Sequence, residues 1–209
     1  MKTTYRKLII ASLFFLTLQI DAQTVRDIFS SKFTNISFLG LDFSKANFIG
    51  PEFNNPQQIK EQYFKEWNDI LMAESKYDLK APLRKANINF DFSITAKRNA
   101  SVATDKLVVY DPVFLTLDDI ASMVKDYQTA DKTGIGLTFI VNLFDYVKGK
   151  SVVNVVFFDM ASKKILLLET LRGEPGGSGI RNYWANSIAN IISKVESTLS
   201  REWELTYFK

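Results

Sequence analysis

The chain is predicted to fold as a single α+β domain, and three observations favour this class. Three extended segments near the C-terminus are joined by connections of two or three residues, which predicts a largely antiparallel sheet with a C-terminal β-meander. Three further segments have apolar residues at helical spacing, and we expect these helices to pack on one face of the sheet. No repeat, low-complexity segment or internal linker divides residues 23–209.

Residues 1–22 have the three regions of a cleavable export signal. The basic n-region comprises Lys2, Arg6 and Lys7. Residues 8–20 are apolar, and Ala22 is a small residue at the expected cleavage point. Thirteen helical residues reach about 20 Å, less than the roughly 30 Å hydrocarbon core, so no stable membrane span is expected after cleavage. An uncleaved signal anchor is the alternative, and the protein is predicted to be periplasmic or secreted.

The first half of the mature chain alternates predicted strands and helices. Residues 36–43 are apolar on both faces, as in a central strand. Asn55 and Pro56 have the residue types of an N-cap and first helical position, and the apolar stripe that follows predicts a helix over 56–74. Trp67 lies in this stripe and is interpreted as core. Residues 86–97 alternate apolar and polar side chains, which predicts a half-buried strand.

The second half contains a short strand, a helix, the meander and a final helix. The short strand covers residues 107–110, and an acidic capping box from Thr116 to Asp119 opens a helix to about residue 128. The predicted meander strands are 134–147, 151–160 and 163–172. A final amphipathic helix is predicted over 180–201, followed by a terminal edge strand over 203–208.

The composition excludes several kinds of chemistry. The chain has no histidine and no cysteine, so it has no imidazole base, no thiolate metal site, no disulfide and no lipobox cysteine. We therefore expect no cofactor and no metal. Residues 23–209 contain 23 basic and 22 acidic residues after the three basic and one acidic residues of the signal are removed. This balance, with no basic run longer than two, argues against a nucleic-acid partner.

Carboxylate pairs and one loop remain as candidate sites. Asp118 and Asp119 lie at a helix start, where acids stabilise the helix, and Asp42 and Asp91 lie in predicted strands with no sign that they meet. Residues 173–179 form a glycine-rich connection into a helix, where backbone N–H groups favour an anion. The candidate ligand-binding residues are Gly176, Gly177, Ser178, Gly179 and Arg181. A flexible connector, with Glu174 balancing Arg181, is the alternative interpretation.

The C-terminal third resembles a group of small exported proteins of Gram-negative anaerobes whose activity is uncharacterised. The resemblance covers residues 152–159, the strand at 165–170, the glycine-rich loop and the stretch Gly-Ile-Arg-Asn-Tyr-Trp-Ala at 179–185. The strand–hairpin–helix order also resembles, more loosely, the periplasmic α/β domains of outer-membrane-associated lipoproteins such as the curli-secretion lipoprotein. The resemblance implies a location in the cell envelope and no known activity, and no catalytic residue follows from it.

We therefore expect an exported, non-catalytic binding or accessory module that acts on an unknown protein or envelope component through a surface or groove. The alternative is a small-ligand-binding protein or a metal-independent hydrolase that uses carboxylates near residues 173–179. An enzyme of that kind predicts one deep pocket with at least two convergent carboxylates. An interaction module predicts an exposed apolar patch or sheet edge instead.

Overall fold

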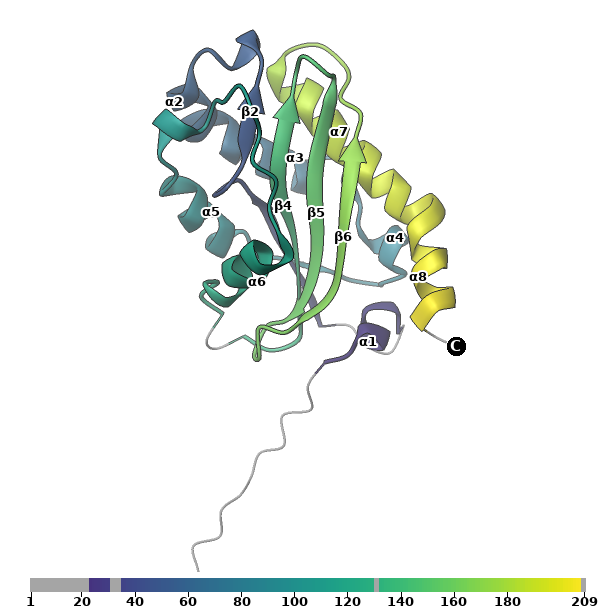
Figure 1. Cartoon of the computed structure of the whole chain (residues 1–209). Helices are drawn as coiled ribbons and strands as arrows, with labels where there is room; N and C mark the ends of the chain where they lie inside the picture. Colours follow the sequence, from purple (N-terminus) through teal and green to yellow (C-terminus); the bar gives the residue numbers. More distant parts are fainter. Residues whose placement is uncertain (1–22, 31–34, 130–131, 208–209) are drawn as a thin grey trace, which may run out of the picture.

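The computed structural model describes residues 23–30, 35–129 and 132–207, and it confirms the α+β class. The predicted export signal at residues 1–22 lies outside the described residues. One mixed sheet of six strands forms the centre of the molecule, with the order β3-β1-β4-β5-β6 and with β2 also paired to β4 (Figure 1). In the part of the chain that the structure describes, no helix combines the length and the apolar character needed to cross a bilayer.

The predicted meander is confirmed and supplies most of the paired residues. Its strands are β4 (Ile135–Asp145), β5 (Lys150–Asp159) and β6 (Ile165–Gly173), which pair antiparallel in sequence order. The strands on the other side of β4 pair in parallel. They are β1 (Ile36–Asp42), β2 (Asn47–Ile49) and β3 (Asn89–Phe90). β1 and β2 follow the same side of β4 one after the other, separated by a turn at residues 43–46.

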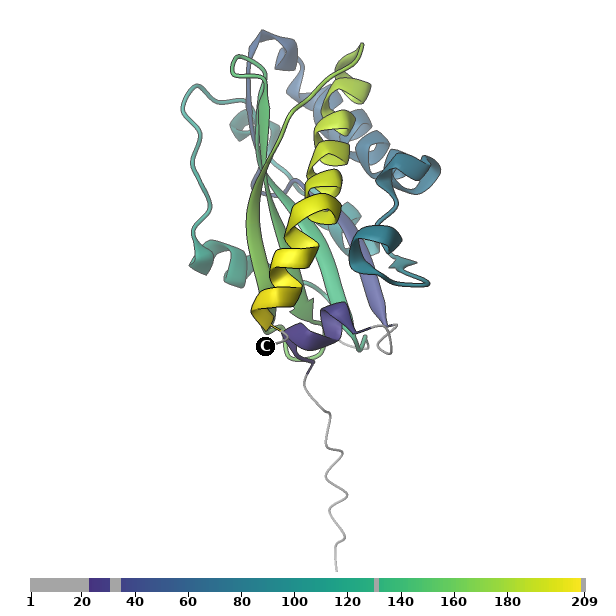
Figure 2. The same cartoon turned by 90° about the vertical axis from the view of Figure 1, so that its right-hand side faces the viewer.

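The expectation that helices cover one face is wrong, because both faces of the sheet are buried. All residues of β4 are buried, so apolar side chains on either side of this strand need cover. The larger core cluster joins one face to α3 (Phe64–Ala73) and α7 (Ile180–Lys194), and a second cluster joins the other face to α6 (Leu117–Lys125). Viewed along the sheet, the helices lie on opposite sides of it (Figure 2).

Three predicted helix starts and stripes are confirmed in detail. The helix predicted over 56–74 runs through α2 (Pro56–Gln58), a π-helical turn (Ile59–Tyr63) and α3. Asn55 caps it by accepting the N–H of Gln58 at 3.1 Å. The capping box at the start of α6 is also present, with Thr116 accepting the N–H of Asp119 at 3.1 Å. α6 ends at Lys125, three residues before its predicted end.

Three strand predictions are wrong. Residues 86–97 contain only the two-residue β3, because Asp91 accepts the N–H and hydroxyl of Ser93 and opens the helix α5 (Ser93–Ala100). Residues 107–110 form a single bridge between Val108 and Phe48, since β1 and β2 already occupy that side of β4.

The remaining short helices are α1 (Val25–Phe29), α4 (Lys80–Leu83) and 3₁₀ turns at Pro51–Phe53, Ser75–Tyr77 and Thr104–Lys106.

The predicted C-terminal edge strand is a helix in its described part. α7 continues through a π-helical turn (Val195–Leu199) into α8 (Ser200–Tyr207), and Phe208 lies outside the described residues. Trp203 is buried against Phe157 and Phe29, so the apolar stripe of α7 is extended by two further turns of helix.

Candidate functional site

The glycine-rich loop is folded back onto the helix that follows it. Gly173 is buried at the end of β6, where an added Cβ atom would lie 2.3 Å from the carbonyl oxygen of Ser187. The N–H of Gly176 donates to the carbonyl of Tyr183 at 3.1 Å, and its own carbonyl accepts the side-chain amide of Asn186 at 2.8 Å. The hydrogen bond to Tyr183 uses the Gly176 N–H, a donor that an anion site would need, which favours the connector interpretation.

The other candidates of this loop lie on the surface. Gly177, Ser178 and Gly179 are exposed, and Gly179 has φ +75° at the N-cap of α7. Arg181 is held 3.8 Å from Glu66 of α3 and donates to the side chain of Asn182, so its balancing acid is Glu66 rather than Glu174. The loop candidates and Arg181 line none of the cavities described below. A ligand-binding role for the loop stays a prediction.

The carboxylates singled out from the sequence are not brought together. Asp91 is paired with Lys132, whose hydrogen bond lowers the pKa of the Asp91 carboxyl. Asp119 caps α6, and its hydrogen bonds with Thr116 lower its pKa. Asp42 is buried and has its own cation, Arg98. Each carboxylate therefore has a local structural partner.

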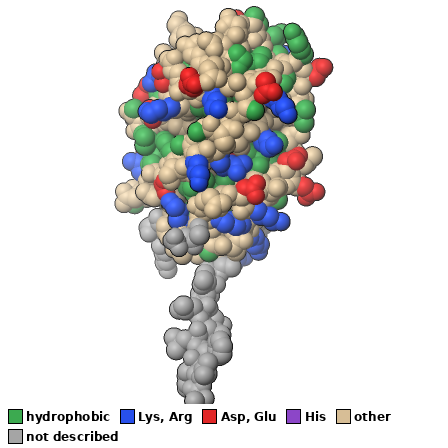
Figure 3. Space-filling model, turned by 90° about the vertical axis from the view of Figure 1, so that its left-hand side faces the viewer, with side chains coloured by type: hydrophobic (Ala, Val, Ile, Leu, Met, Phe, Trp, Pro, Cys, Tyr) green, Lys and Arg blue, Asp and Glu red, His purple; other side chains and the backbone are tan. Residues whose placement is uncertain are grey.

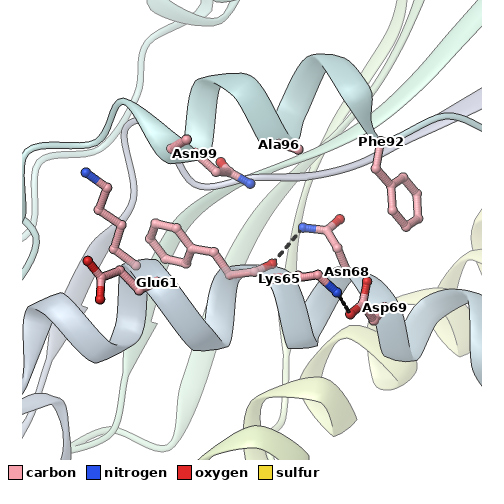
Figure 4. A pocket seen from close by; sticks show the side chains of 10 residues that line it. Glu61, Lys65, Asn68, Asp69, Phe92, Ala96 and Asn99 are labelled. Carbon is pink, nitrogen blue, oxygen red and sulfur yellow. Dashed lines mark hydrogen bonds and ion pairs between the residues drawn. The ribbon is translucent and has the colours of Figure 1, made fainter.

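The largest described cavity is a groove between α3 and α5, which we call the helix groove (Figure 4). Its volume is about 570 Å³, within the range of small-molecule sites. Apolar side chains and two amides form its floor, and charged side chains of α3 and the turn before it form its rim. The floor consists of Phe64, Asn68, Phe92, Ala96, Asn99 and Ala100, and the rim of Lys60, Glu61, Lys65 and Asp69.

The floor of the helix groove lies on the edge of β1. β3 pairs with only Ser37 and Phe38 of β1, so among the described residues the rest of that edge has no neighbouring strand. Asn68 accepts the N–H of Leu41 at 2.7 Å, and Asn99 accepts the N–H of Phe43 at 2.7 Å while donating to the carbonyl of Leu41 at 2.9 Å. The two amides therefore replace a strand, which closes the edge and holds α3 and α5 apart.

The rim charges of the helix groove balance one another. Lys65 pairs with Asp69 one turn later, and Glu61 accepts a hydrogen bond from Gln57. Glu61 and Asp69 are eight residues apart on one continuous helix, which separates their backbones by about 12 Å along the axis. Paired catalytic carboxylates of glycosidases lie closer than about 10 Å. Glu61 and Asp69 each have a partner on their own helix, and their spacing gives no sign that they converge on one bond.

A buried polar network lies behind the groove, at the C-terminal end of β1. Asp42 has no exposed surface, and it accepts hydrogen bonds from Arg98 Nε at 2.9 Å, Tyr127 Oη at 2.8 Å and the N–H of Ser44 at 2.8 Å. Burial, and then the charge of Asp42, raise the pKa of Tyr127 well above its usual range, so its hydroxyl stays protonated and donates. This network ties β1 to α5 and to the end of α6.

A segment between α5 and α6 crosses the sheet and exposes apolar side chains. We call residues 107–116 the crossing segment. Tyr110 and Val113 are 96% and 73% exposed, and Leu117, the first residue of α6, is 70% exposed. The segment is nevertheless anchored, because the carbonyl of Val113 accepts the side-chain amides of Asn47 and Asn142 at 3.3 and 3.0 Å. An ordered segment with exposed apolar side chains is typical of an interaction surface.

The residues of these sites carry no motif that a sequence alone reveals. Asn68 and Asn99 lie in ordinary helical positions, and Asp42 and Arg98 are 56 positions apart. The one available signal was Gly40, which has φ +89° and whose added Cβ would lie 2.3 Å from Asn68 Oδ1. A glycine within a strand indicates a bulge or a close contact, and here it marks the closed edge.

No protein-family model matches the chain, and no curated protein matches it. Function is therefore inferred from the residues and their geometry. The resemblance of residues 152–185 to exported proteins stays a prediction.

Proposed function

We propose that the chain is an exported, non-catalytic binding module of the cell envelope, and that its binding site is the helix groove. The observation that carries this proposal is the floor of the groove. Half-buried Phe92 offers aromatic surface and Ala96 and Ala100 are exposed. Asn68 and Asn99 have their amide oxygens committed to the backbone N–H groups of Leu41 and Phe43. A ligand therefore gains free energy mainly by covering apolar surface.

The charges of the rim select against a strongly charged ligand. Two lysines and two acids alternate along the rim, so the groove entrance has no net charge. The volume of about 570 Å³ suits a small molecule. The occupant we propose is an uncharged, largely apolar small molecule.

The predicted export of the chain is consistent with a binding module of the cell envelope, but it does not indicate which ligand is bound. The export signal expected at residues 1–22 assigns the module to the periplasm or the medium. The hydrolase alternative is less well supported, because Glu174, the one acid within residues 173–179, is exposed while its N–H donates to Asn190 on α7.

The test uses N-phenyl-1-naphthylamine, a neutral apolar fluorescent probe. Ala96→Leu and Ala100→Leu fill the groove from exposed positions of α5, so the double variant should weaken probe binding by about tenfold or more. Ala81→Leu, on an exposed position of α4 away from the cavities, is the matched control and should bind like the parent protein. Equal affinity of the groove-filling variant and the control would refute the assignment, as would the absence of probe binding.

A further inference from the structure

A second cavity of about 400 Å³ lies between the turn after β1, the end of α5 and the crossing segment. We call it the cationic pocket. Its polar lining residues are Ser44, Lys45, Asn47, Arg98, Ser101 and Lys106. Its apolar lining residues are Ala46, Val102, Ala103, Leu107, Val113 and Leu115. The pocket shares no lining residue with the helix groove.

Arg98 is fixed in place before any ligand arrives. Its Nε donates to the buried Asp42 at 2.9 Å, its Nη2 donates to Ser44 Oγ at 3.0 Å, and its guanidinium carbon lies 5.0 Å from the ring centre of Tyr127. The Nη1 group has no protein hydrogen-bond partner within the described ranges, and the side chain keeps 20% of its surface exposed. A guanidinium held in this way loses little freedom when it binds an oxyanion.

The charge of the pocket favours a multiply charged anion. Lys45 and Lys106 are exposed at its rim, and no carboxylate lines it. The carboxylate of Asp42, which does not line the pocket, balances the charge of Arg98. Asp119 is held at the start of α6 by its hydrogen bonds with Thr116, and it interacts electrostatically with Lys45 from outside the pocket. Figure 3 shows Lys and Arg side chains spread over the face that carries α5, with acidic and apolar side chains between them.

We propose that the cationic pocket binds a phosphate monoester with a compact apolar body. The phosphate pairs with Arg98, Lys45 and Lys106, because a phosphate monoester carries nearly two negative charges at neutral pH. The apolar body lies against the apolar lining residues, among them Leu107, Val113 and Leu115. This inference is independent of the function proposed for the helix groove, and it adds a second ligand class to the same module.

Calorimetric titration of the full mature chain with phenyl phosphate, inorganic phosphate and benzoate tests the proposal. Phenyl phosphate should bind more tightly than inorganic phosphate, which lacks the apolar body, and more tightly than benzoate, which carries one charge. Vesicles that contain phosphatidic acid distinguish a lipid phosphate from a soluble one. If the vesicles bind and phenyl phosphate does not, the soluble ligand class is refuted.

Charge-matched variants locate the site. Lys45→Gln with Lys106→Gln should weaken phenyl phosphate binding by about tenfold for each lysine removed. Lys125→Gln with Lys164→Gln removes the same charge from exposed positions outside the cavities and should change the affinity less than about twofold. An equal loss in both pairs, or tighter binding of benzoate, would overturn the proposal. The groove-filling variant at Ala96 and Ala100 should bind phenyl phosphate normally. A negative result for the cationic pocket would therefore leave the proposal for the helix groove untouched, and the reverse also holds.

Discussion

At the scale of single residues, Asp42 shows how a buried charge is stabilised in this fold. Three donors from three elements surround its carboxylate, and one of them is the cation Arg98. Burying two charges costs desolvation energy that their attraction recovers only when the remaining polar atoms are also hydrogen-bonded. The network satisfies that condition, which explains a fully buried acid in a core rich in phenylalanine.

Removal of one partner should therefore cost more than removal of both charges. Arg98→Ala leaves Asp42 buried without its cation and should lower the free energy of unfolding by about 3 kcal/mol. Arg98→Ala combined with Asp42→Asn should lower it less, because the uncompensated charge is gone. Urea unfolding measures both values, and Lys97→Ala at the neighbouring exposed position serves as control. A loss for Arg98→Ala no larger than that of the control would contradict this account.

At the scale of elements, the glycine-rich connection combines two glycines with different tasks. Gly173 lets β6 approach α7 closely, since its added Cβ would meet the backbone of Ser187. Gly176 has open space around it, with no atom within 4 Å of an added Cβ. Glycine is therefore required by close packing at position 173, whereas at position 176 there is room for a side chain.

This difference predicts opposite outcomes for one substitution. Gly173→Ala should lower the free energy of unfolding by about 1–3 kcal/mol, because a strand and a helix must move apart. Gly176→Ala should change it by less than about 0.5 kcal/mol. Thermal and urea unfolding of the two variants provide the measurement. Equal stability of the two variants would show that β6 and α7 are not packed as closely as described.

Local patterns predicted the elements whose signals are local. The Asn55 cap, the capping box at Thr116 and the short connections of the meander each depend on residues a few positions apart, and all three are present. The alternation over 86–97 was misleading because two local hydrogen bonds, from the N–H and hydroxyl of Ser93 to Asp91, outweighed the strand pattern. The C-terminal helix was missed because the partners of Trp203, Phe29 and Phe157, are remote in sequence.

The candidate sites could not be predicted from the sequence, because their residues are also remote from one another along the chain. The helix groove joins α3 to α5 across β1, and the cationic pocket joins residues 44–47 to the crossing segment. Each depends on the mixed sheet, in which β1 and β2 share one side of β4. A glycine-rich loop is visible in sequence because its residues are adjacent, yet adjacency does not create a cavity.

At the scale of the whole molecule, α8 closes the fold against its first helix. Trp203 lies 5.9 Å from Phe29 of α1 and 6.2 Å from Phe157 of β5, measured between ring centres, and its indole N–H donates to Glu169 at 3.2 Å. The carbonyl of Tyr207 accepts a hydrogen bond from Arg26 at 3.1 Å. These contacts hold the first and last described helices at one end of the sheet (Figure 1).

Trp203→Ala should therefore release both helices together. The substitution removes a buried indole and should lower the free energy of unfolding by about 3–5 kcal/mol. Limited proteolysis should cut the variant first near α1, which loses its partner on α8. Leu205→Ala, on the same helix but 56% exposed, should change stability by less than about 0.5 kcal/mol. Resistance of α1 to proteolysis in the tryptophan variant would argue against coupled docking.

Because α1 contacts α8, the two ends of the described chain lie close together. A short linker from residue 207 to residue 23 would join the ends, and new termini opened at Gly177 would lie in an exposed connection at the far end of the sheet (Figure 1). Such a circularly permuted chain keeps every strand pairing of the meander while reversing which part of the core is synthesised first.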